Sequence, residues 1–230
     1  KETLVQTAIQ GLEEAGYFGA PLLMKLSTQA GPNQSALNAV VAKVNDQLIA
    51  QLKAEEPGHR QRAALALGQI GDPSTAPALA NLLADASNQV RFSAAAALAE
   101  MGQAQGVDFL FDALRNTDSI LRANAVKFLV NVQAQSGSVE DQLVAALDAT
   151  DPLARAGAAQ VLGQAAVTSA LSALIAVTSD EVAEVRANAV IALGRIGSTQ
   201  SRERLEQLLN DRDATVSYYA QWALRQLGSG

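Results

Sequence analysis

The sequence contains no cysteine, and this absence excludes several kinds of site at once. A chain without thiols forms no disulfide, no thiolate metal site, no thiol nucleophile and no thioether to a cofactor of its own. The redox compartment stays open, and a cytoplasmic location is expected only by default. The single histidine, His59, has no second histidine or cysteine near it in sequence, which predicts neither a metal site nor a catalytic triad.

Positive charge and long apolar runs are also scarce. The 17 lysines and arginines are outnumbered by 23 aspartates and glutamates, so the net charge is −6 and no basic footprint for nucleic acid is present. No apolar run approaches the roughly 20 residues that a membrane-spanning helix needs. Acidic pairs lie at expected helix ends, and no nucleophile stands beside a base, so we expect no catalytic residues.

What the sequence does contain is an internal repeat. An arginine, taken here as the anchor, is followed by small or apolar residues at anchor +3, +4, +7 and +10. The intervals between the anchors are 31, 31, 33 and 31 residues, and a further step of 31 reaches Ser217. The positions +3, +4, +7 and +10 within each unit are typical of one apolar helix face. The anchors are Arg60, Arg91, Arg122, Arg155 and Arg186.

The second half of each unit again carries leucines at helical spacing, so each unit is predicted to be a helical hairpin. Asp72-Pro73 and Asp151-Pro152 are typical of an N-cap followed by a first-turn proline. A hairpin of this size cannot bury its own apolar stripe, but a stack of three or more can. We therefore predict an all-α, right-handed α-solenoid with about five full repeats, a terminal half repeat and an irregular N-terminal cap.

The domain boundaries follow from where the repeat begins. Residues 1–56 are predicted to form an irregular helical cap that includes a leading half repeat at 35–55, and residues 57–230 a single repeat array. Tyr17 and Phe18 lie in the predicted cap. They are interpreted either as part of that cap or as a docking segment.

Three segments carry a resemblance to a known family. The units "DASNQVRFSAAAALAEMG" (85–102) and "EVRANAVIALGRIG" (184–197) resemble the short HEAT-like repeats named for phycobilisome lyases. The segment "YYAQWAL" (218–224) is similar to one in the chains that attach bilins to phycobiliproteins, although Arg225 stands where a glycine is expected.

The resemblance implies a chaperone-like solenoid that holds a phycobiliprotein subunit and, transiently, a linear tetrapyrrole (phycobilin). It would assist bilin attachment to, or detachment from, a client cysteine, with a second HEAT-like subunit as a further partner. Whether the protein is an enzyme is left open, and no covalently bound cofactor is expected. The alternative is a general protein-interaction scaffold with no pigment connection and no catalysis.

The anchor arginines have two interpretations. Each has an acidic residue four or six positions earlier, as Asp85, Asp118 and Asp151 illustrate. We expect these charges to form a ladder of ion pairs that fixes the register of neighbouring repeats, because a two-point arginine–carboxylate pair is directional. The functional alternative is a row of cations for an anionic ligand such as the propionates of a tetrapyrrole.

The aromatic residues, only 4% of the chain, are the candidate partner contacts. Phe109 at anchor +18 and Phe111 at +20 are expected on the second helix of a repeat, beside Asp112, where an exposed phenylalanine would anchor a client. Solenoid irregularity could bury both instead.

The last unit holds the other aromatic candidates. Tyr218 and Trp222 are one helical turn apart on one stripe, with Tyr219 beside them. This stripe is interpreted as a cap that closes the stack, as a partner surface, or as a face left bare because the chain is a fragment.

Overall fold

The computed structural model describes residues 34–228, so the predictions for Tyr17 and Phe18 lie outside the described residues. Within that range every regular element is helical, and no strand occurs. The α-helices are α3 (Gln34–Gln51), α4 (Pro57–Ile70), α5 (Ala76–Asn81), α6 (Asn88–Glu100), α7 (Ala104–Leu114), α8 (Ser119–Ser136), α9 (Glu140–Ala146), α10 (Pro152–Gln164), α11 (Leu171–Val177), α12 (Ala183–Ile196), α13 (Arg202–Gln207) and α14 (Ala214–Leu227).

Short 3₁₀ turns flank several of the second helices of the hairpins. They are η2 (Pro73–Thr75), η3 (Leu82–Ala84), η4 (Thr168–Ala170), η5 (Thr199–Ser201) and η6 (Leu208–Asn210). The two predicted aspartate N-caps followed by a first-turn proline are confirmed. The Asp72 side chain accepts from the Ser74 N–H at the start of η2, and the Asp151 side chain accepts from the Leu153 N–H at the start of α10.

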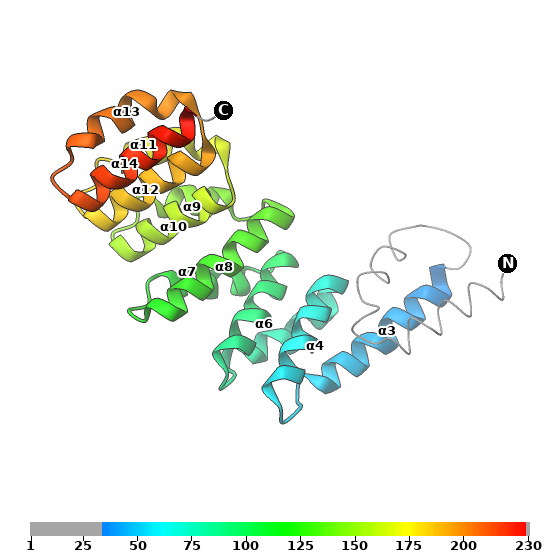
Figure 1. Ribbon diagram of the computed structural model, residues 1–230. Helices are drawn as coiled ribbons and strands as arrows, with labels where there is room; N and C mark the ends of the chain where they lie inside the picture. The colour runs from blue at the N-terminus through cyan, green and yellow to red at the C-terminus, as the bar shows by residue number, and fades with distance from the viewer. Residues whose placement is uncertain (1–33, 229–230) are drawn as a thin grey trace. The chain divides into compact units, whose positions relative to one another are not determined.

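The chain divides into two compact units, residues 1–109 and 110–230, and each is described by itself. In the first unit, α3 packs on α4, and α4 on α6 (Figure 1). The helix predicted over 35–55 corresponds to α3, which ends at Gln51. One buried cluster includes Val44 and Leu48 of α3 together with Leu67 of α4 and Leu98 of α6.

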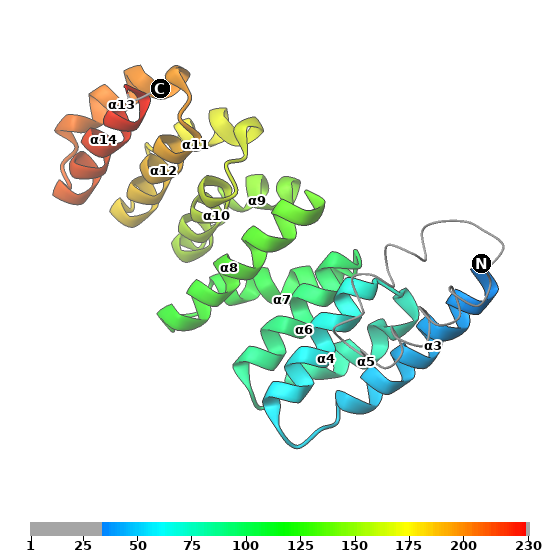
Figure 2. The same ribbon diagram turned by 45° about the vertical axis from the view of Figure 1, so that its right-hand side comes forward.

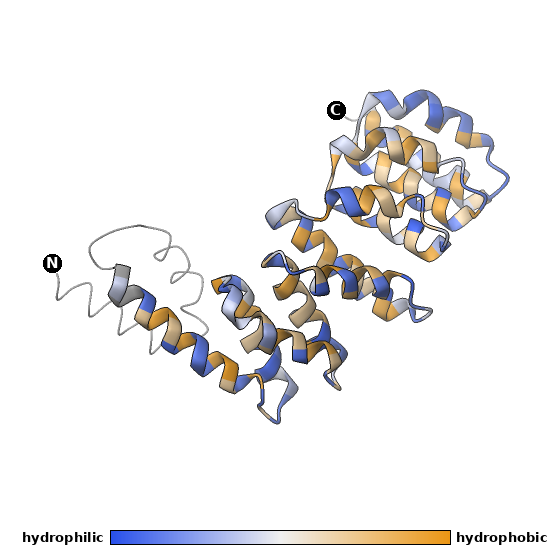
Figure 3. Ribbon diagram, turned by 180° about the vertical axis from the view of Figure 1, so that it is seen from behind, coloured by the Kyte–Doolittle hydropathy of each residue, from blue (hydrophilic) through white to orange (hydrophobic). Residues whose placement is uncertain are grey.

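In the second unit, α10, α12 and α14 lie side by side, and Figure 2 shows the same order from a second direction. The second helices α9, α11 and α13 complete their hairpins. Figure 3 colours α13 as mostly hydrophilic, in contrast to the apolar helices beneath it. Only Leu205 of α13 is fully buried, so this helix contributes one apolar anchor and otherwise a polar surface.

The predicted core positions are confirmed. The leucines at anchor +7 have no exposed surface in any of the five full repeats, because +3, +4 and +7 form the face on which the hairpins stack. They are Leu67, Leu98, Leu129, Leu162 and Leu193. Each second helix adds a leucine that is also fully buried: Leu79, Leu110, Leu143, Leu174 and Leu205.

Left-handed residues end most of the first helices. Gly71, Gly102 and Gly197, all at anchor +11, have φ values of 69°, 71° and 71°. A glycine adopts this conformation without the clash that a Cβ introduces, which is why it ends helices so often. In the fourth repeat Ala166 occupies the same position with φ 51°, the one non-glycine residue with positive φ in the described part of the chain.

Candidate functional site

Three anchor arginines each form a bidentate ion pair with the aspartate 25 residues later in the sequence. Arg155 donates from Nε and Nη2 to Asp180 at 2.7 and 3.0 Å, and Arg186 to Asp211 at 2.9 and 2.7 Å. Arg60 pairs with Asp85 in the same way, at 2.7 and 2.9 Å. Each aspartate stands six residues before the next anchor position, so each pair joins consecutive repeats.

The remaining nitrogen of the same arginines binds the main chain. Nη1 of Arg155 donates to the carbonyl oxygens of Ala149 and Thr150 at 2.8 and 3.1 Å. Nη1 of Arg186 donates to those of Asp180 and Glu181 at 2.9 and 3.1 Å. Each guanidinium is therefore held on two edges, which fixes the direction in which its Nε–Nη2 edge points.

These contacts shift the ionisation of the paired groups. The hydrogen bond from Arg186 lowers the pKa of Asp211, against the opposing effect of burial, and the same bond raises the pKa of Arg186. Burial alone would raise the pKa of Asp180, but the hydrogen bonds from Arg155 and from the Val182 N–H outweigh it, and the pKa is lowered. All four side chains are therefore charged at neutral pH, as a structural ion pair requires.

The ladder differs from the expectation at Asp118 and Asp151. Both carboxylates cap the following helix, accepting from the N–H of Ile120 and Leu153 at 2.8 Å each. A residue four positions before the anchor lies at the helix start, where its side chain satisfies a free N–H. Only the position six before the anchor faces the preceding arginine.

Two arginines of the predicted ladder have no aspartate partner. Within residues 34–228, neither Arg91 nor Arg122 forms an ion pair. By sequence position, the residue in place of the aspartate is Asn116 for Arg91 and Ala149 for Arg122. The nitrogen Nη1 of Arg122 nonetheless donates to the carbonyl oxygens of Asn116 and Thr117, at 2.7 and 2.9 Å, as in the paired repeats.

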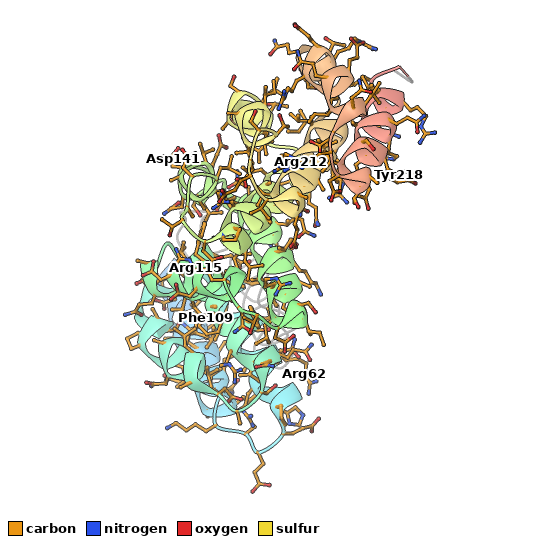
Figure 4. The ribbon with its side chains drawn as sticks, turned by 90° about the vertical axis from the view of Figure 1, so that its left-hand side faces the viewer. Arg62, Phe109, Arg115, Asp141, Arg212 and Tyr218 are labelled. Atoms are coloured by element: carbon orange, nitrogen blue, oxygen red, sulfur yellow. The ribbon has the colours of Figure 1, made fainter. Side chains whose placement is uncertain are left out.

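Phe109 lies between the exposed and the buried arrangement, both of which the sequence left open. It is half-buried, and its ring lies edge-on against buried Phe92, with centroids 5.5 Å apart and planes at 77°. Figure 4 shows Phe109 among the side chains of its own unit. Phe111 is also half-buried, while Asp112 is exposed and pairs with Arg115. The close approach at Gly106, where a Cβ would lie 2.3 Å from the Ala95 carbonyl oxygen, brings α7 onto α6 and covers part of Phe109.

The aromatic stripe of α14 divides into a packed and an exposed part. Trp222 is half-buried and packs against Gly194 of α12. The contact is so close that a Cβ placed on Gly194 would lie 2.5 Å from the Trp222 Cζ3 atom. Tyr219 is half-buried, and its ring meets Tyr218 edge-on at 5.4 Å. Tyr218 itself is 60% exposed (Figure 4).

The exposed face of α14 corresponds to a buried face of α12. Anchor +1 is Ala187 in α12, 7% exposed, and Tyr218 in α14. The residues at +4 and +8 of α12 are also buried, and their counterparts in α14, Gln221 and Arg225, are exposed. Small or apolar residues have thus been replaced by large and polar ones.

Two shallow grooves run along the repeat edge of the second unit. One, of about 450 Å³, is lined by Arg186, Arg204 and Arg212 together with Asp180 and Asp211. The other, of about 490 Å³, includes Arg155, Asp180 and Glu181. Sequence reasoning missed the place of Arg204 in the first groove, because Arg204 stands at anchor +18, which was expected to face away.

Arg204 also joins two hairpins. Its Nε donates to the Thr178 hydroxyl at 2.7 Å, and its Nη2 donates to the Thr178 carbonyl oxygen at 3.1 Å, directly after α11. A cation at a helix C-terminus is favoured by the helix dipole. Nothing in the sequence pattern signals this contact, since no other repeat has arginine at this position.

Other classes of site were searched for in the described residues. No group of three or more histidine, cysteine, aspartate or glutamate side chains there could hold a metal ion. None of the helices in residues 34–228 is long and apolar enough to cross a membrane. His59 is exposed and lies 3.6 Å from the Glu56 carboxylate.

Comparison with solved structures returns helical repeat proteins. A HEAT-like repeats protein from the archaeon Thermococcus onnurineus NA1 is 13% identical, with a TM-score of 0.46 and coverage of 96% of this chain and 97% of its own. Human deoxyhypusine hydroxylase is 19% identical, with a TM-score of 0.44 and coverage of 100% and 99%. A designed armadillo repeat protein is 24% identical, with a TM-score of 0.40 and coverage of 79% and 98%.

The family comparison is more decisive. The search of curated proteins finds no match. The family model for HEAT repeats matches residues 45–131 and 140–225, which together are most of the sequence. The predicted fold class, an all-α HEAT-repeat solenoid, is confirmed, whereas the match does not reach the narrower phycobilisome lyase type. The chain belongs to the HEAT repeat family.

Proposed function

We propose that this protein is a protein-binding scaffold and that the outer face of α14 contacts its partner. HEAT repeats generally serve as protein-interaction scaffolds, and this chain belongs to that family. The α14 face is defined by Tyr218, Gln221 and Arg225, together with the exposed edge of Trp222. A tyrosine, a tryptophan and an arginine are the residue types in which protein-binding energy concentrates.

The observation that carries the proposal is the change at anchor +1. This position is buried as Ala156 in α10, at 5% exposure, and as Ala187 in α12, at 7%, yet it is Tyr218 in α14, at 60%. The Tyr218 ring offers a large amphipathic surface where the equivalent alanines offer almost none. Its hydroxyl can form a hydrogen bond while the ring buries apolar area, which suits a protein interface.

A further hairpin stacked with the same spacing fits this face poorly. Where α10 meets α12, a Cβ placed on Gly163 would lie 2.5 Å from the Ala192 Cβ, so these two helices approach as closely as they do because anchor +8 is glycine, and Gly194 has the same role between α12 and α14. In α14 this position is Arg225. The occupant we propose is therefore a different folded protein, whose surface offers apolar contact to Tyr218 and acceptors to its hydroxyl.

Site-specific crosslinking tests the proposal. A photoreactive phenylalanine analogue at position 218 should capture a protein partner from source lysate, and the same analogue at position 209 provides the control. Leu209 is 42% exposed in the same unit but stands after α13. With the partner purified, Tyr218→Ala should weaken binding about tenfold or more, and Leu209→Ala should not. Equal crosslinking at both positions, or unchanged affinity of Tyr218→Ala, would count against the proposal.

A narrower version names the partner. If it is a phycobiliprotein subunit, the protein would assist attachment or detachment of a linear tetrapyrrole, as the resemblance of residues 218–224 implies. Support comes from that segment alone. Titration with a phycobilin should then change the bilin absorbance spectrum, and Trp222→Leu should reduce the change. An unaltered spectrum in the presence of the crosslinked partner would leave the scaffold proposal in place and remove the pigment.

A further inference from the structure

The guanidinium of Arg122 is held in the same way as those of Arg155 and Arg186. In all three, Nη1 donates to the carbonyl oxygens of the residues six and five positions earlier. Arg122 also follows an aspartate N-cap by four residues, as Arg155 does. The main chain therefore fixes the orientation of Arg122 before any ligand arrives.

The opposite edge of Arg122 differs from its counterparts. In Arg155 and Arg186 the Nε and Nη2 atoms bind both oxygens of an aspartate, at distances of 2.7–3.0 Å. For Arg122, no residue in the range 34–228 takes that place. The equivalent aspartate is Ala149, whose methyl group has no acceptor, and this repeat is two residues longer than its neighbours.

We propose that the Nε–Nη2 edge of Arg122 binds a carboxylate from outside the chain, supplied by an acidic side chain of a protein partner. Arg155 and Arg186, whose Nη1 atoms bind main-chain carbonyl oxygens in the same way, already bind a carboxylate with this edge, and so does Arg60. These three pairs indicate that a carboxylate is the ligand that suits the Nε–Nη2 edge of Arg122. A preorganised guanidinium loses less conformational freedom on binding than a free surface arginine does.

The surroundings of Arg122 favour a protein as the source of the carboxylate. Ile120, in the same first turn of α8, is 70% exposed, the highest value among the large apolar side chains of residues 34–228. An apolar contact beside a cation suits an acidic side chain on a protein surface better than a free small anion. Asp118 does not block the site, because Asp151 stands in the same relation to Arg155, which binds Asp180.

The proposal rests on the proposed function only in that the carboxylate belongs to a protein. The two contacts can be tested apart, because the Nε–Hε signal of Arg122 reports on this site in the isolated protein. In ¹H–¹⁵N spectra at constant ionic strength, titration with a capped tri-glutamate peptide should shift the Arg122 signal saturably. The signals of Arg155 and Arg186, which already have carboxylate partners, should remain in place.

Several outcomes would overturn the proposal. If the Arg122 signal moves no more than that of Arg155, the edge is not a carboxylate site. If sodium acetate saturates the signal as tightly as the tri-glutamate peptide does, the site takes free carboxylates and the protein source is wrong. Arg122→Lys assigns the Nε–Hε signal by its disappearance, and it keeps the charge while removing the bidentate geometry. Followed instead by the backbone amide signals of the first turn of α8, the tri-glutamate affinity of this variant should be several-fold lower than that of the wild type.

A partner identified by crosslinking at position 218 provides the second readout. Arg122→Ala should weaken its binding about tenfold. Arg115→Ala removes the same charge from an exposed pair in the same unit and should have little effect. Equal losses in the two variants would show a general charge effect and overturn the assignment to Arg122. A failure at Tyr218 would leave the titration of Arg122 unaffected, so the two proposals can fail separately.

Discussion

Arg186 and Asp211 form a two-point ion pair between consecutive repeats, with Nε–Oδ2 and Nη2–Oδ1 distances of 2.9 and 2.7 Å and only 5% and 9% of the two side chains exposed. The Asp211 carboxylate also accepts from the Asp213 N–H at 2.8 Å. It thus links the turn before α14 to α12. Loss of the negative charge should loosen this junction without removing apolar contacts.

Asp211→Asn should lower the free energy of unfolding by about 1–2 kcal/mol at pH 7, allowing for solvent at the edge of the pair. The pKa of Asp211 is lowered in the folded state by the hydrogen bond from Arg186. This stability is therefore present above the unfolded pKa of about 4 and is lost as the pH falls below it and through the lowered folded value. Urea unfolding at several pH values should show the wild type and the variant converging in acid.

The control for this prediction is Asp112→Asn. Asp112 forms an exposed pair with Arg115, and 76% of its side chain is in solvent, so no measurable change is expected. A stability difference between wild type and Asp211→Asn that is the same at pH 7 and pH 3 would contradict the role assigned to the carboxylate.

Leu98→Ala should be among the most destabilising single changes. Leu98 has no exposed surface, and removing its branch leaves a cavity in the stacked core, which costs about 2–5 kcal/mol. Because repeats are stabilised by their neighbours, hydrogen exchange should accelerate in the adjacent helices as well. Denaturant unfolding measures the loss.

Arg122→Ala provides the comparison for Leu98→Ala. Arg122 has no aspartate partner within residues 34–228, so Arg122→Ala should lower the free energy of unfolding clearly less than Leu98→Ala does. If the two variants lose the same free energy of unfolding, Arg122 must form a buried contact other than the ion pairs between repeats.

The regular part of the fold was predictable because it repeats. The period places Leu98 and Leu193 at the same helical position, and both are fully buried. The ladder was predictable only in outline. Asp151 and Asp211 both precede an anchor position, but one caps its own helix and the other pairs with the preceding repeat. The choice depends on a two-residue difference in spacing that decides which repeat the side chain faces.

The candidate site was harder to predict, because it depends on how closely helices approach. The helical phase of Phe109 left both exposure and burial open. Gly106 decides between them, because it lets α7 approach α6 so that the ring meets Phe92. The clamp on Arg122 is made by main-chain carbonyl oxygens, which any sequence supplies. Composition and spacing contain no trace of contacts of this kind.

Ala166→Gly should stabilise the protein. Ala166 adopts a φ of 51° at the position that is glycine in three other repeats, and a Cβ in this region costs about 1 kcal/mol or more. Part of that gain is offset by the greater freedom of glycine in the unfolded chain. The net increase in the free energy of unfolding should be up to about 1 kcal/mol.

The neighbouring alanine is a matched control for Ala166→Gly. Ala165 has φ −80° at the end of α10, so Ala165→Gly relieves no strain and should destabilise by about 0.5–1 kcal/mol. Thermal unfolding of the two variants should therefore move in opposite directions. Destabilisation by both changes would indicate that Ala166 is not strained.

Gly194→Ala should destabilise the junction of α12 and α14, although alanine is the better helix former by about 1 kcal/mol. The added Cβ would lie 2.5 Å from Trp222 Cζ3, 2.9 Å from the Ala223 Cβ and 3.0 Å from the Ala223 Cα. The indole can turn aside, but the α14 backbone cannot move without loosening the hairpin, so overpacking of about 1–3 kcal/mol should prevail.

Two further variants separate the ring from the backbone. Trp222→Leu in the Gly194→Ala background should recover part of the loss, since it removes the nearest clash and leaves Ala223 in place. Gly58→Ala should be neutral or stabilising, because its Cβ would meet only the flexible ends of Glu56 and Arg62. Denaturant unfolding of the three variants decides the matter. If Gly194→Ala is as well tolerated as Gly58→Ala, then α14 does not approach α12 as closely as a glycine contact requires, and Trp222 does not lie against Gly194.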